Sequence, residues 1–442
     1  MNLLEKIAWY RKNRGLRALV RRAFKGRDAS FTLPGEAART GAMTPSAAEL
    51  KAALSGQVTD VDSLVRQAFA PIQPLPIYQA PGPRARINLV TDSISSGSLF
   101  GGVATAIILA VLLAKRTGAK LRVVTRSEAP DEAGFAHVLS CNGIDYDDNV
   151  EFVQMALWDT RAQLDICAGD RFLTTSWWTT ASVLGSVPAS KVDYLLQEDE
   201  RMFYPYGDEW LRCQELLSRQ DIRFIVNTHL LYRHFLASGL EHMERQGVWF
   251  EPAFPTRPPN ESAIRKSGEK LKFFFYARPN NLRNLFYRGI EVLNQAVTEG
   301  ALDPARWDVY FVGKDIPKLK LGGVMEPIVL PTMGWKDYGD FVASVDLGFC
   351  LMSTPHPSYP PLDLAVAGAL VLTNQFGLKQ DLSEYSGRIS CVPLDTGSLV
   401  KGLRQALEHA ERERKTGRPQ GTYHHLSTSW TDSLAAVVER LG

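Results

Sequence analysis

Residues 347–374 read LGFCLMSTPHPSYPPLDLAVAGALVLTN. The apolar run at 347–352 predicts a buried strand, and the proline-containing loop after it leads into a predicted helix that starts near Leu362. Pro361 suits the first turn of this helix, where a missing backbone N–H costs nothing, and Gly368 suits its C-terminal cap. A second buried strand follows directly. Strand, helix and strand in this order form the β-α-β unit of a parallel sheet, so this stretch predicts an α/β fold.

The same alternation of apolar runs and helical stretches extends along most of the chain. In the first half we predict strands at 87–92, 121–125, 150–155, 172–176, 192–197 and 224–227. In the second half we predict strands at 271–276, 309–312, 328–330, 347–352 and 370–373, and helices at 285–298, 338–344 and from 362. The chain has 442 residues, and single cores stop growing near roughly 250–300 residues. Two Rossmann-like domains are therefore expected.

Two proline-rich segments divide the chain. One ends a basic N-terminal extension that is expected to be helical, and the other interrupts the pattern between positions 252 and 259. The expected organisation is an extension and linker at 1–85, a Rossmann-like acceptor domain at 86–255 and a Rossmann-like donor domain at 265–420. Residues 421–442 are expected to form a last helix that packs on the N-terminal domain.

Composition excludes several classes of protein. With 45% apolar and 22% charged residues, the chain is an ordinary folded protein. Its five cysteines are scattered singly, which signals neither a disulfide framework nor a zinc site. No apolar run reaches the roughly 18–20 residues that span a bilayer. We therefore expect a cytoplasmic protein that binds no metal and no nucleic acid.

The first 27 residues are strongly basic, with nine Lys and Arg against one Glu. Apolar residues recur among them at near-helical spacing. The segment is either an amphipathic helix on the anionic inner face of a membrane or a helix packed on the protein with a solvated basic face.

A glycine-containing loop, DSISSGSLFGG at 92–102, follows the first predicted strand. Gly101 and Gly102 precede a predicted helix, whose N-terminal N–H groups suit a phosphate. The spacing matches neither the dinucleotide fingerprint nor a P-loop, which disfavours dehydrogenases and NTPases. The alternative is that both glycines serve only a tight turn.

Two arginines follow the first strand of the second domain, in FFFYARPNNLRN at 273–284. Ligands of open α/β sheets bind at the carboxyl ends of strands, so Arg278 and Arg283 lie where a diphosphate would bind. Their guanidinium groups would stabilise charge as a nucleoside diphosphate leaves. Arg283 lies in the following turn, and its alternative interpretation is an arginine that is only solvated.

The opening stretch resembles the donor motif of a large retaining glycosyltransferase family, the glycosyl transferases group one, of GT-B architecture. That family's pattern is Glu-Gly-Phe-Gly-x-Pro-x-x-Glu-Ala-x-Ala-x-Gly, with the second Glu on the ribose and the first on the sugar. Asp363 takes the second position, in the first helical turn, and Pro355 takes the first, so one acidic sugar contact is missing. Alone, Asp363 would be only a residue that complements the helix dipole.

A second likeness is narrower. The runs HPSYPPL at 356–362, YLLQEDE at 194–200 and FYP at 203–205 look like bacterial rhamnosyltransferases of cell-surface polysaccharide assembly that use dTDP-rhamnose. The resemblance extends in outline from about residue 86 to residue 408.

The resemblance implies a role for each site residue. Arg278 and Arg283 would bind the diphosphate as catalytic residues. The donor would also contact Gly101, Gly102, Gly313, Gly334, His356, Ser358, Tyr359, Pro360, Leu362 and Asp363. Gln197, Glu198 and Glu200 would face the acceptor, unless they form only a solvated acidic turn.

The implied activity is transfer of a deoxyhexose, rhamnose, from a nucleotide sugar to a saccharide or lipid-linked glycan acceptor, with retention of configuration. Asp145-x-Asp147 is similar to a metal-binding motif of other glycosyltransferases but lies in a predicted turn, so a metal-independent mechanism without a cofactor is expected. The alternatives are a non-catalytic nucleotide-sugar or glycan-binding scaffold, because the first Glu is missing, and an NAD oxidoreductase, which the glycine pattern disfavours.

Overall fold

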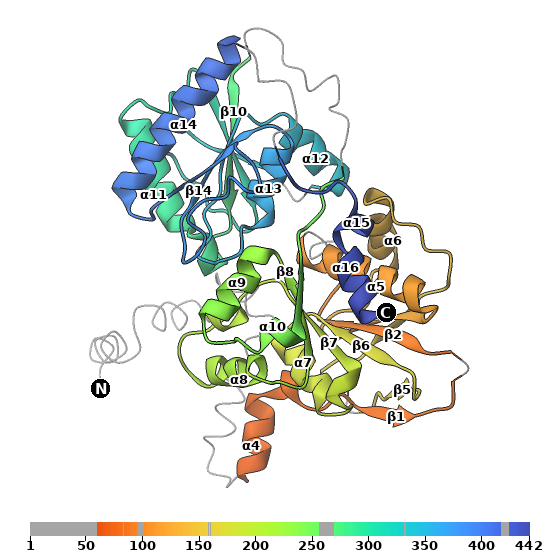
Figure 1. Ribbon diagram of the computed structural model, residues 1–442. Helices are drawn as coiled ribbons and strands as arrows, with labels where there is room; N and C mark the ends of the chain where they lie inside the picture. Colours follow the sequence, from red (N-terminus) through yellow and green to blue (C-terminus); the bar gives the residue numbers. More distant parts are fainter. Residues whose placement is uncertain are drawn as a thin grey trace, which may run out of the picture.

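The computed structural model describes residues 60–82, 84–95, 101–157, 159, 161–255, 269–330, 333–416 and 424–442. These residues form two lobes, each built on a parallel sheet with helices packed against it (Figure 1). The predicted fold class, α/β with two Rossmann-like domains, is confirmed. The predictions made for residues 1–59, including the basic helix at 1–27, lie outside the described residues.

The N-terminal lobe holds a seven-stranded sheet of order β4-β3-β2-β6-β7-β8-β9, with all neighbours parallel. Its strands are β2 (Arg86–Thr91), β3 (Lys120–Thr125), β4 (Glu151–Gln154), β6 (Arg171–Thr174), β7 (Val192–Leu196), β8 (Arg223–Asn227) and β9 (Gly247–Phe250). Its helices are α5 (Gly102–Thr117), α6 (Glu132–Cys141), α7 (Trp177–Leu184), α8 (Asp208–Leu217), α9 (His229–Ala237) and α10 (Met243–Gln246). Short 3₁₀ turns lie at η2 (Ala189–Lys191) and η3 (Glu200–Phe203).

The strand order of this sheet reverses at β2. From β2 the chain adds β3 and β4 on one side and then β6 on the other. The carboxyl ends of β2 and β6 therefore flank a topological switch point, where open α/β sheets bind ligands. Helix α5 follows β2 and is buried at every position from 104 to 114, because its sequence is apolar on all sides.

The C-terminal lobe repeats this plan with a six-stranded sheet of order β12-β11-β10-β13-β14-β15, again parallel throughout. Its strands are β10 (Leu271–Ala277), β11 (Trp307–Gly313), β12 (Ile328–Leu330), β13 (Leu347–Phe349), β14 (Leu370–Asn374) and β15 (Ile389–Val392). Its helices are η5 (Leu282–Asn284), α11 (Phe286–Thr298), α12 (Trp335–Ala343), α13 (Tyr359–Val366) and α14 (Thr396–Thr416). Here the order reverses between β10 and β13, so the switch point lies after these two strands.

The end of the chain packs on the N-terminal lobe. Helix α16 (Ala435–Leu441) lies beside α5 and β9, and α15 (Trp430–Ser433), which precedes it, lies beside α6 (Figure 1). Trp430, Leu434 and Val437 are buried in the same apolar core as α5. The indole Nε1 of Trp430 donates to Asn142 Oδ1 at 3.0 Å. The described end of the chain is thus part of the core of the first lobe.

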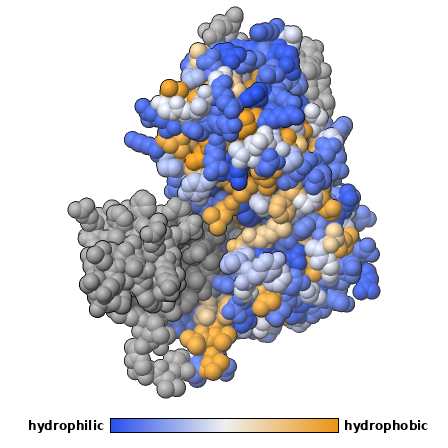
Figure 2. All heavy atoms as spheres, turned by 90° about the vertical axis from the view of Figure 1, so that its left-hand side faces the viewer, coloured by the Kyte–Doolittle hydropathy of each residue, from blue (hydrophilic) through white to orange (hydrophobic). Residues whose placement is uncertain are grey.

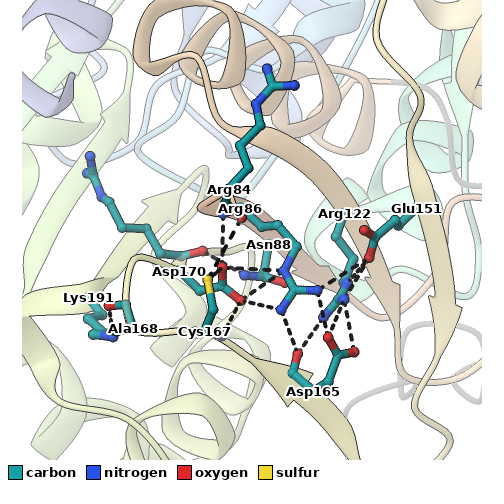
Figure 3. Close-up of polar contacts among 11 residues, drawn as sticks. Arg84, Arg86, Asn88, Arg122, Glu151, Asp165, Cys167, Ala168, Asp170 and Lys191 are labelled. Carbon is teal, nitrogen blue, oxygen red and sulfur yellow. Dashed lines mark hydrogen bonds and ion pairs between the residues drawn. The ribbon is translucent and has the colours of Figure 1, made fainter. Parts of the chain in front are cut away.

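A network of ion pairs, in which the arginines and Asp170 are buried and Asp165 and Glu151 are partly exposed, joins the amino ends of the N-terminal strands (Figure 3). Arg86, only 9% exposed, is 2.7 Å from Asp165 and 2.9 Å from Asp170. Arg122 contacts Asp165 at 3.0 Å and Glu151 at 2.6 Å. Asp165 lies in β5 (Leu164–Ile166), which pairs with β1 (Ile77–Gln79) in a small second sheet. Since buried charges are tolerated only when paired, these ions tie the small sheet to the large one, at the end opposite the switch point.

The first described helix, α4 (Val61–Ala68), buries none of its residues. Val61, Leu64 and Val65 are 74%, 47% and 39% exposed. Figure 2 shows apolar side chains at the lower end of the molecule, whereas the upper lobe is mostly hydrophilic. A 3₁₀ turn, η1 (Ala70–Ile72), connects α4 to the rest of the lobe.

The stretch at 347–374 differs from its prediction in two details. Strand β13 ends at Phe349 rather than at Met352, and the N–H of Met352 donates to the side-chain oxygen of Asn374 at 2.7 Å. Helix α13 begins at Tyr359 rather than near Leu362. Asp363 is therefore the fifth residue of the helix, and its predicted place in the first turn is wrong.

Candidate functional site

Side chains from the carboxyl ends of both sheets meet between the lobes. Tyr359, at the start of α13, reaches across from the C-terminal lobe. Its hydroxyl oxygen accepts from Asn227 Nδ2 at 2.9 Å and lies 2.7 Å from the hydroxyl of Thr105. A Cβ on Gly101, which has φ of +68°, would lie 3.3 Å from the Tyr359 ring. Two predicted donor residues, Gly101 and Tyr359, are thus in contact although they belong to different lobes.

Gln197 and Gly102 form the N-terminal wall of this junction. Gln197 follows β7, and its Nε2 donates to the carbonyl of Gly102 at 2.7 Å. Its Oε1 accepts from Asn227 Nδ2 at 3.3 Å. The Gln197 amide is therefore fixed between the start of α5 and the end of β8, beside Tyr359.

Glu198 makes charged contacts between the lobes. Its Oε2 accepts from the hydroxyl of Thr354 at 2.5 Å, and its Oε1 lies 3.3 Å from Arg283 Nη1. The second contact is an ion pair rather than a well-directed hydrogen bond, since Nη1 has no hydrogen-bond partner among the described residues. The Arg283 guanidinium also stacks over Phe203 at 4.2 Å. Neither Glu198 nor Arg283 is a solvated surface residue.

Glu200 corrects the prediction of an acceptor-facing or solvated residue. It is only 3% exposed and lies beneath the junction. Its carboxyl accepts from the backbone N–H of Trp177 at 2.9 Å and from the hydroxyl of Tyr194 at 2.8 Å. Burial raises its pKa from 4.5 to about 8, against the lowering effect of these hydrogen bonds. Glu200 therefore holds a proton at neutral pH.

The loop before α13 carries the buried imidazole of His356. This residue is 2% exposed, and its Nδ1 accepts from the backbone N–H of Ser358 at 2.9 Å. Its Nε2 is buried without a hydrogen-bond partner among the described residues. Burial lowers its pKa to about 4, with the charges of Lys379 and Arg283 contributing. The ring is neutral at physiological pH and offers one unused ring nitrogen.

Arg278 lies apart from this cluster. Its Nη1 donates to the hydroxyl of Tyr276 at 3.1 Å, and its stem packs against Gly313. A Cβ on Gly313 would lie 1.7 Å from the carbonyl oxygen of Ala277 and 3.2 Å from Arg278 Cγ. The structure therefore brings Arg278 and Gly313 together at the ends of β10 and β11, but it does not join Arg278 to Glu198.

The remaining predicted donor residues follow α12 and α13. Asp363 accepts from the hydroxyl of Tyr338 at 3.4 Å, and Gly334 is the N-cap of the helix that carries Tyr338. Pro360 is half-buried. The side chain of Leu362 is fully buried in an apolar core, which leaves only its backbone for a ligand.

Sequence reasoning missed five side chains of the junction: Thr105, Phe203, Asn227, Thr354 and Lys379. Lys379 is 0% exposed, and its Nζ donates to the carbonyl of Met352 at 3.1 Å. It follows β14 in the sequence QFGLKQ, where a lysine between turn residues looks like a surface residue. The position of Lys379 after a strand of the second sheet was a signal that could have indicated a site residue.

A cavity of about 750 Å³ lies elsewhere, beside β9 and the end of the chain. His229, Trp249, Glu251, Tyr385 and Arg440 are among its lining residues. None of the predicted donor or acceptor residues lines it. We place the candidate site at the junction, where the predicted residues converge.

Comparison with protein families gives two matches. Residues 86–228 match the family model described as WsaF, N-terminal domain, and residues 271–404 match WsaF, C-terminal domain. The chain thus matches WsaF over both domains. The first WsaF-like domain covers the N-terminal sheet from β2 to β8, and the second covers the C-terminal sheet. The junction lies between the two WsaF-like domains.

Individual proteins are similar at lower coverage. The O-antigen biosynthesis protein RfbC of Myxococcus xanthus is 30% identical over 289 residues, which are 62% of this chain and 21% of that protein. The chain therefore spans about a fifth of the length of this curated relative. The solved structure of WaaG, a glycosyltransferase involved in lipopolysaccharide biosynthesis, has a TM-score of 0.48 and 16% identity over 81% of this chain and 99% of its own. The structure of HepE of Anabaena in complex with UDP has a TM-score of 0.48 and 14% identity, and the match covers 80% of this chain and 95% of HepE.

In the part of the chain that the structure describes, no helix is long and apolar enough to cross a membrane.

Proposed function

We propose that this protein is a glycosyltransferase that moves a deoxyhexose, rhamnose, from a nucleoside diphosphate to a saccharide acceptor in surface polysaccharide synthesis. The observation that carries the proposal is the contact between the ends of both sheets, where Arg283 meets Glu198 and Tyr359 meets Asn227 and Gly101. The O-antigen biosynthesis protein and the WsaF domain matches support the class of reaction.

The donor's nucleotide takes the C-terminal side of the junction. Arg278, Gly313 and Gly334 lie at the ends of β10 and β11 and the start of α12, and Asp363 projects from the neighbouring α13. In the proposal, Asp363 accepts from the ribose and the arginines stabilise the departing diphosphate. These guanidinium groups supply positive charge without a metal ion, so the reaction is proposed to be metal-independent, and retention follows the family resemblance.

The sugar takes the space that faces Pro355 and the N-terminal lobe. Pro355 is buried and provides neither a charge nor a hydrogen-bond donor. A 6-deoxy sugar presents a methyl group where glucose presents a hydroxymethyl group, and a methyl group suits an apolar neighbour. The acceptor, a saccharide or a lipid-linked glycan, approaches from the side of Gln197 and Glu198, and residues 1–27 are proposed to hold the enzyme at the inner face of the membrane.

Thermal unfolding with a panel of nucleoside diphosphates tests the donor. A ligand at one hundred times its Kd stabilises the folded state by about 2.7 kcal/mol, so dTDP should raise the melting temperature more than UDP or GDP. The variants Arg278→Met and Arg283→Met should lose the shift. Arg404→Met is the matched control, since Arg404 forms an exposed pair with Glu299. Stabilisation by none of the three nucleotides contradicts the proposal.

A non-catalytic nucleotide-sugar-binding scaffold is the second candidate, favoured by Pro355 at the place of an acidic residue. Tight donor binding without turnover on the correct acceptor would support it and exclude the enzyme.

A further inference from the structure

Positive charge is concentrated in the C-terminal half of the junction. Arg283 comes from η5 after β10, and Lys379 comes from the loop after β14. Both lie against the loop that follows β13: the carbonyl of Arg283 accepts from Ser353 N–H at 2.7 Å, and Nζ of Lys379 donates to the carbonyl of Met352 at 3.1 Å. The residues Arg283 and Lys379 thus both contact this short loop, Arg283 through its backbone and Lys379 through its ammonium.

Lys379 is buried in a way that is costly unless an anion compensates it. Its side chain is fully buried, and its ammonium has one acceptor among the described residues, whereas an ammonium has three donors. Burial lowers its pKa to about 8, and Cys391 and, to a smaller extent, the charge of Glu198 oppose that lowering. A buried charge without full pairing costs stability, so Lys379 is a poor choice for stability alone.

Other polar atoms at the same place are incompletely paired. His356 Nε2 and Arg283 Nη1 are buried without a hydrogen-bond partner among the described residues. Glu198 lies 3.3 Å from Arg283 Nη1, and the charges of Glu198, Lys379 and Arg283 all act on the pKa of His356. The cluster is therefore a mostly buried group with two cations, Arg283 and Lys379, and one carboxylate, Glu198.

The anion now in contact with this site comes from the opposite lobe. The carboxylate of Glu198 bonds Thr354 and pairs with Arg283. A carboxylate presents two oxygens to guanidinium and hydroxyl donors much as a phosphate group does. It also carries a negative charge against Arg283, the residue proposed to bind the donor's diphosphate.

We propose that the Glu198 carboxylate occupies the cationic site between the lobes as a stand-in for the diphosphate, and that the donor displaces it. Lys379 is a further cation that holds the bound diphosphate. This inference rests on the proposed function and extends it to two residues and to a competition. Displacement frees the Glu198 carboxylate on the acceptor side of the junction. It also replaces the contact between Glu198 and Arg283 by a bound diphosphate that touches both lobes.

The competition is measured by titrating the full chain with inorganic pyrophosphate and with dTDP in a calorimeter. Glu198→Gln keeps the shape of the side chain and removes its charge, so both ligands should bind about tenfold more tightly, a change of about 1.4 kcal/mol. Lys379→Met keeps the length of the side chain and should weaken both about tenfold or more. Lys401→Gln is the control, because Lys401 is exposed on α14, and it should change neither affinity.

Thermal unfolding separates binding from folding. Lys379→Met should unfold at the same temperature as the wild type or higher, because it removes an incompletely paired buried charge. A lysine with a purely structural role would give a lower melting temperature and an unchanged affinity, and this result would overturn its assignment. Equal affinities of the wild type and Glu198→Gln would overturn the competition.

The outcomes also distinguish this inference from the proposed function. A wild-type chain that binds pyrophosphate but no nucleoside diphosphate contradicts the proposed donor, while a tighter Glu198→Gln complex with pyrophosphate still supports the stand-in. A chain that binds nucleoside diphosphates equally well with and without the Glu198 charge supports the donor and overturns the stand-in. Binding of neither ligand overturns both.

Discussion

Replacing Glu200 with glutamine should stabilise the protein, and the gain should grow with pH. Glu200 is buried, and burial raises its pKa from 4.5 to about 8. In its neutral form, one oxygen accepts from the N–H of Trp177 while the other group faces the hydroxyl of Tyr194, which is able to reverse its hydrogen bond. Glutamine reproduces this arrangement, with its carbonyl on Trp177 and its NH₂ group on Tyr194.

The pH dependence follows from the raised pKa. The folded state of the wild type binds this proton more tightly than the unfolded state does. The stability that the proton contributes is complete below pH 4.5 and is lost as the pH rises to about 8. At about 1.36 kcal/mol per pKa unit, the loss is at most about 5 kcal/mol. Glutamine does not ionise and keeps its contribution throughout.

Urea unfolding at pH 5, 7 and 8.5 measures this effect. The difference in unfolding free energy between Glu200→Gln and the wild type should increase from pH 5 to pH 8.5 in favour of the variant. Glu215→Gln on α8 is the control, because Glu215 is exposed and should give a difference near zero at each pH. A difference that stays constant with pH, or a variant that is less stable at pH 8.5, would refute the buried, protonated Glu200.

Three further substitutions test the fold. Asp170→Asn leaves the buried Arg86 short of one partner and should lower the unfolding free energy at pH 7 by about 3 kcal/mol. Arg86 holds the pKa of Asp170 below its usual range despite burial, so the deficit should shrink as the pH falls through that pKa, as urea unfolding would detect. Tyr359→Phe removes the hydroxyl that binds Asn227, and differential scanning calorimetry should find it destabilised by about 1–2 kcal/mol. Gly313→Ala places a methyl group 1.7 Å from a backbone oxygen, and circular dichroism should find a lower melting temperature, by contrast with an unchanged one for the exposed Gly387→Ala.

The strands of both cores were predictable because they are continuous apolar runs between helices. FFFYA at 273–277 is buried in a sheet covered on both faces, and such strands read as unbroken hydrophobic sequence. The small β1–β5 sheet and the edge strands β9 and β15 were missed because they are short and partly exposed. Helix α14 was missed although Leu399, Leu403 and Leu407 recur at a helical spacing that predicts it.

The site was predictable only as far as one strand end at a time. Arg283 and Tyr359 were placed at the correct edge because each directly follows a strand or a loop of the second sheet. Their partners Glu198 and Asn227 belong to the other lobe, and no local pattern encodes the approach of two lobes. Glu200 was misjudged because an acidic run looks solvated, whereas the 3₁₀ turn η3 rotates this one carboxyl toward Tyr194. Lys379 was missed because burial of an ammonium has no sequence signature, and only its position after β14 pointed to the site.

The most direct test of the glycosyltransferase proposal is donor turnover. The full chain is incubated with dTDP-rhamnose, UDP-glucose or GDP-mannose in the presence of a chelator, and release of the nucleoside diphosphate is followed by chromatography. The account predicts release of dTDP from dTDP-rhamnose, with loss of the activity in Arg283→Met and full activity in Arg404→Met. No binding and no turnover of any of the three nucleotide sugars would contradict it.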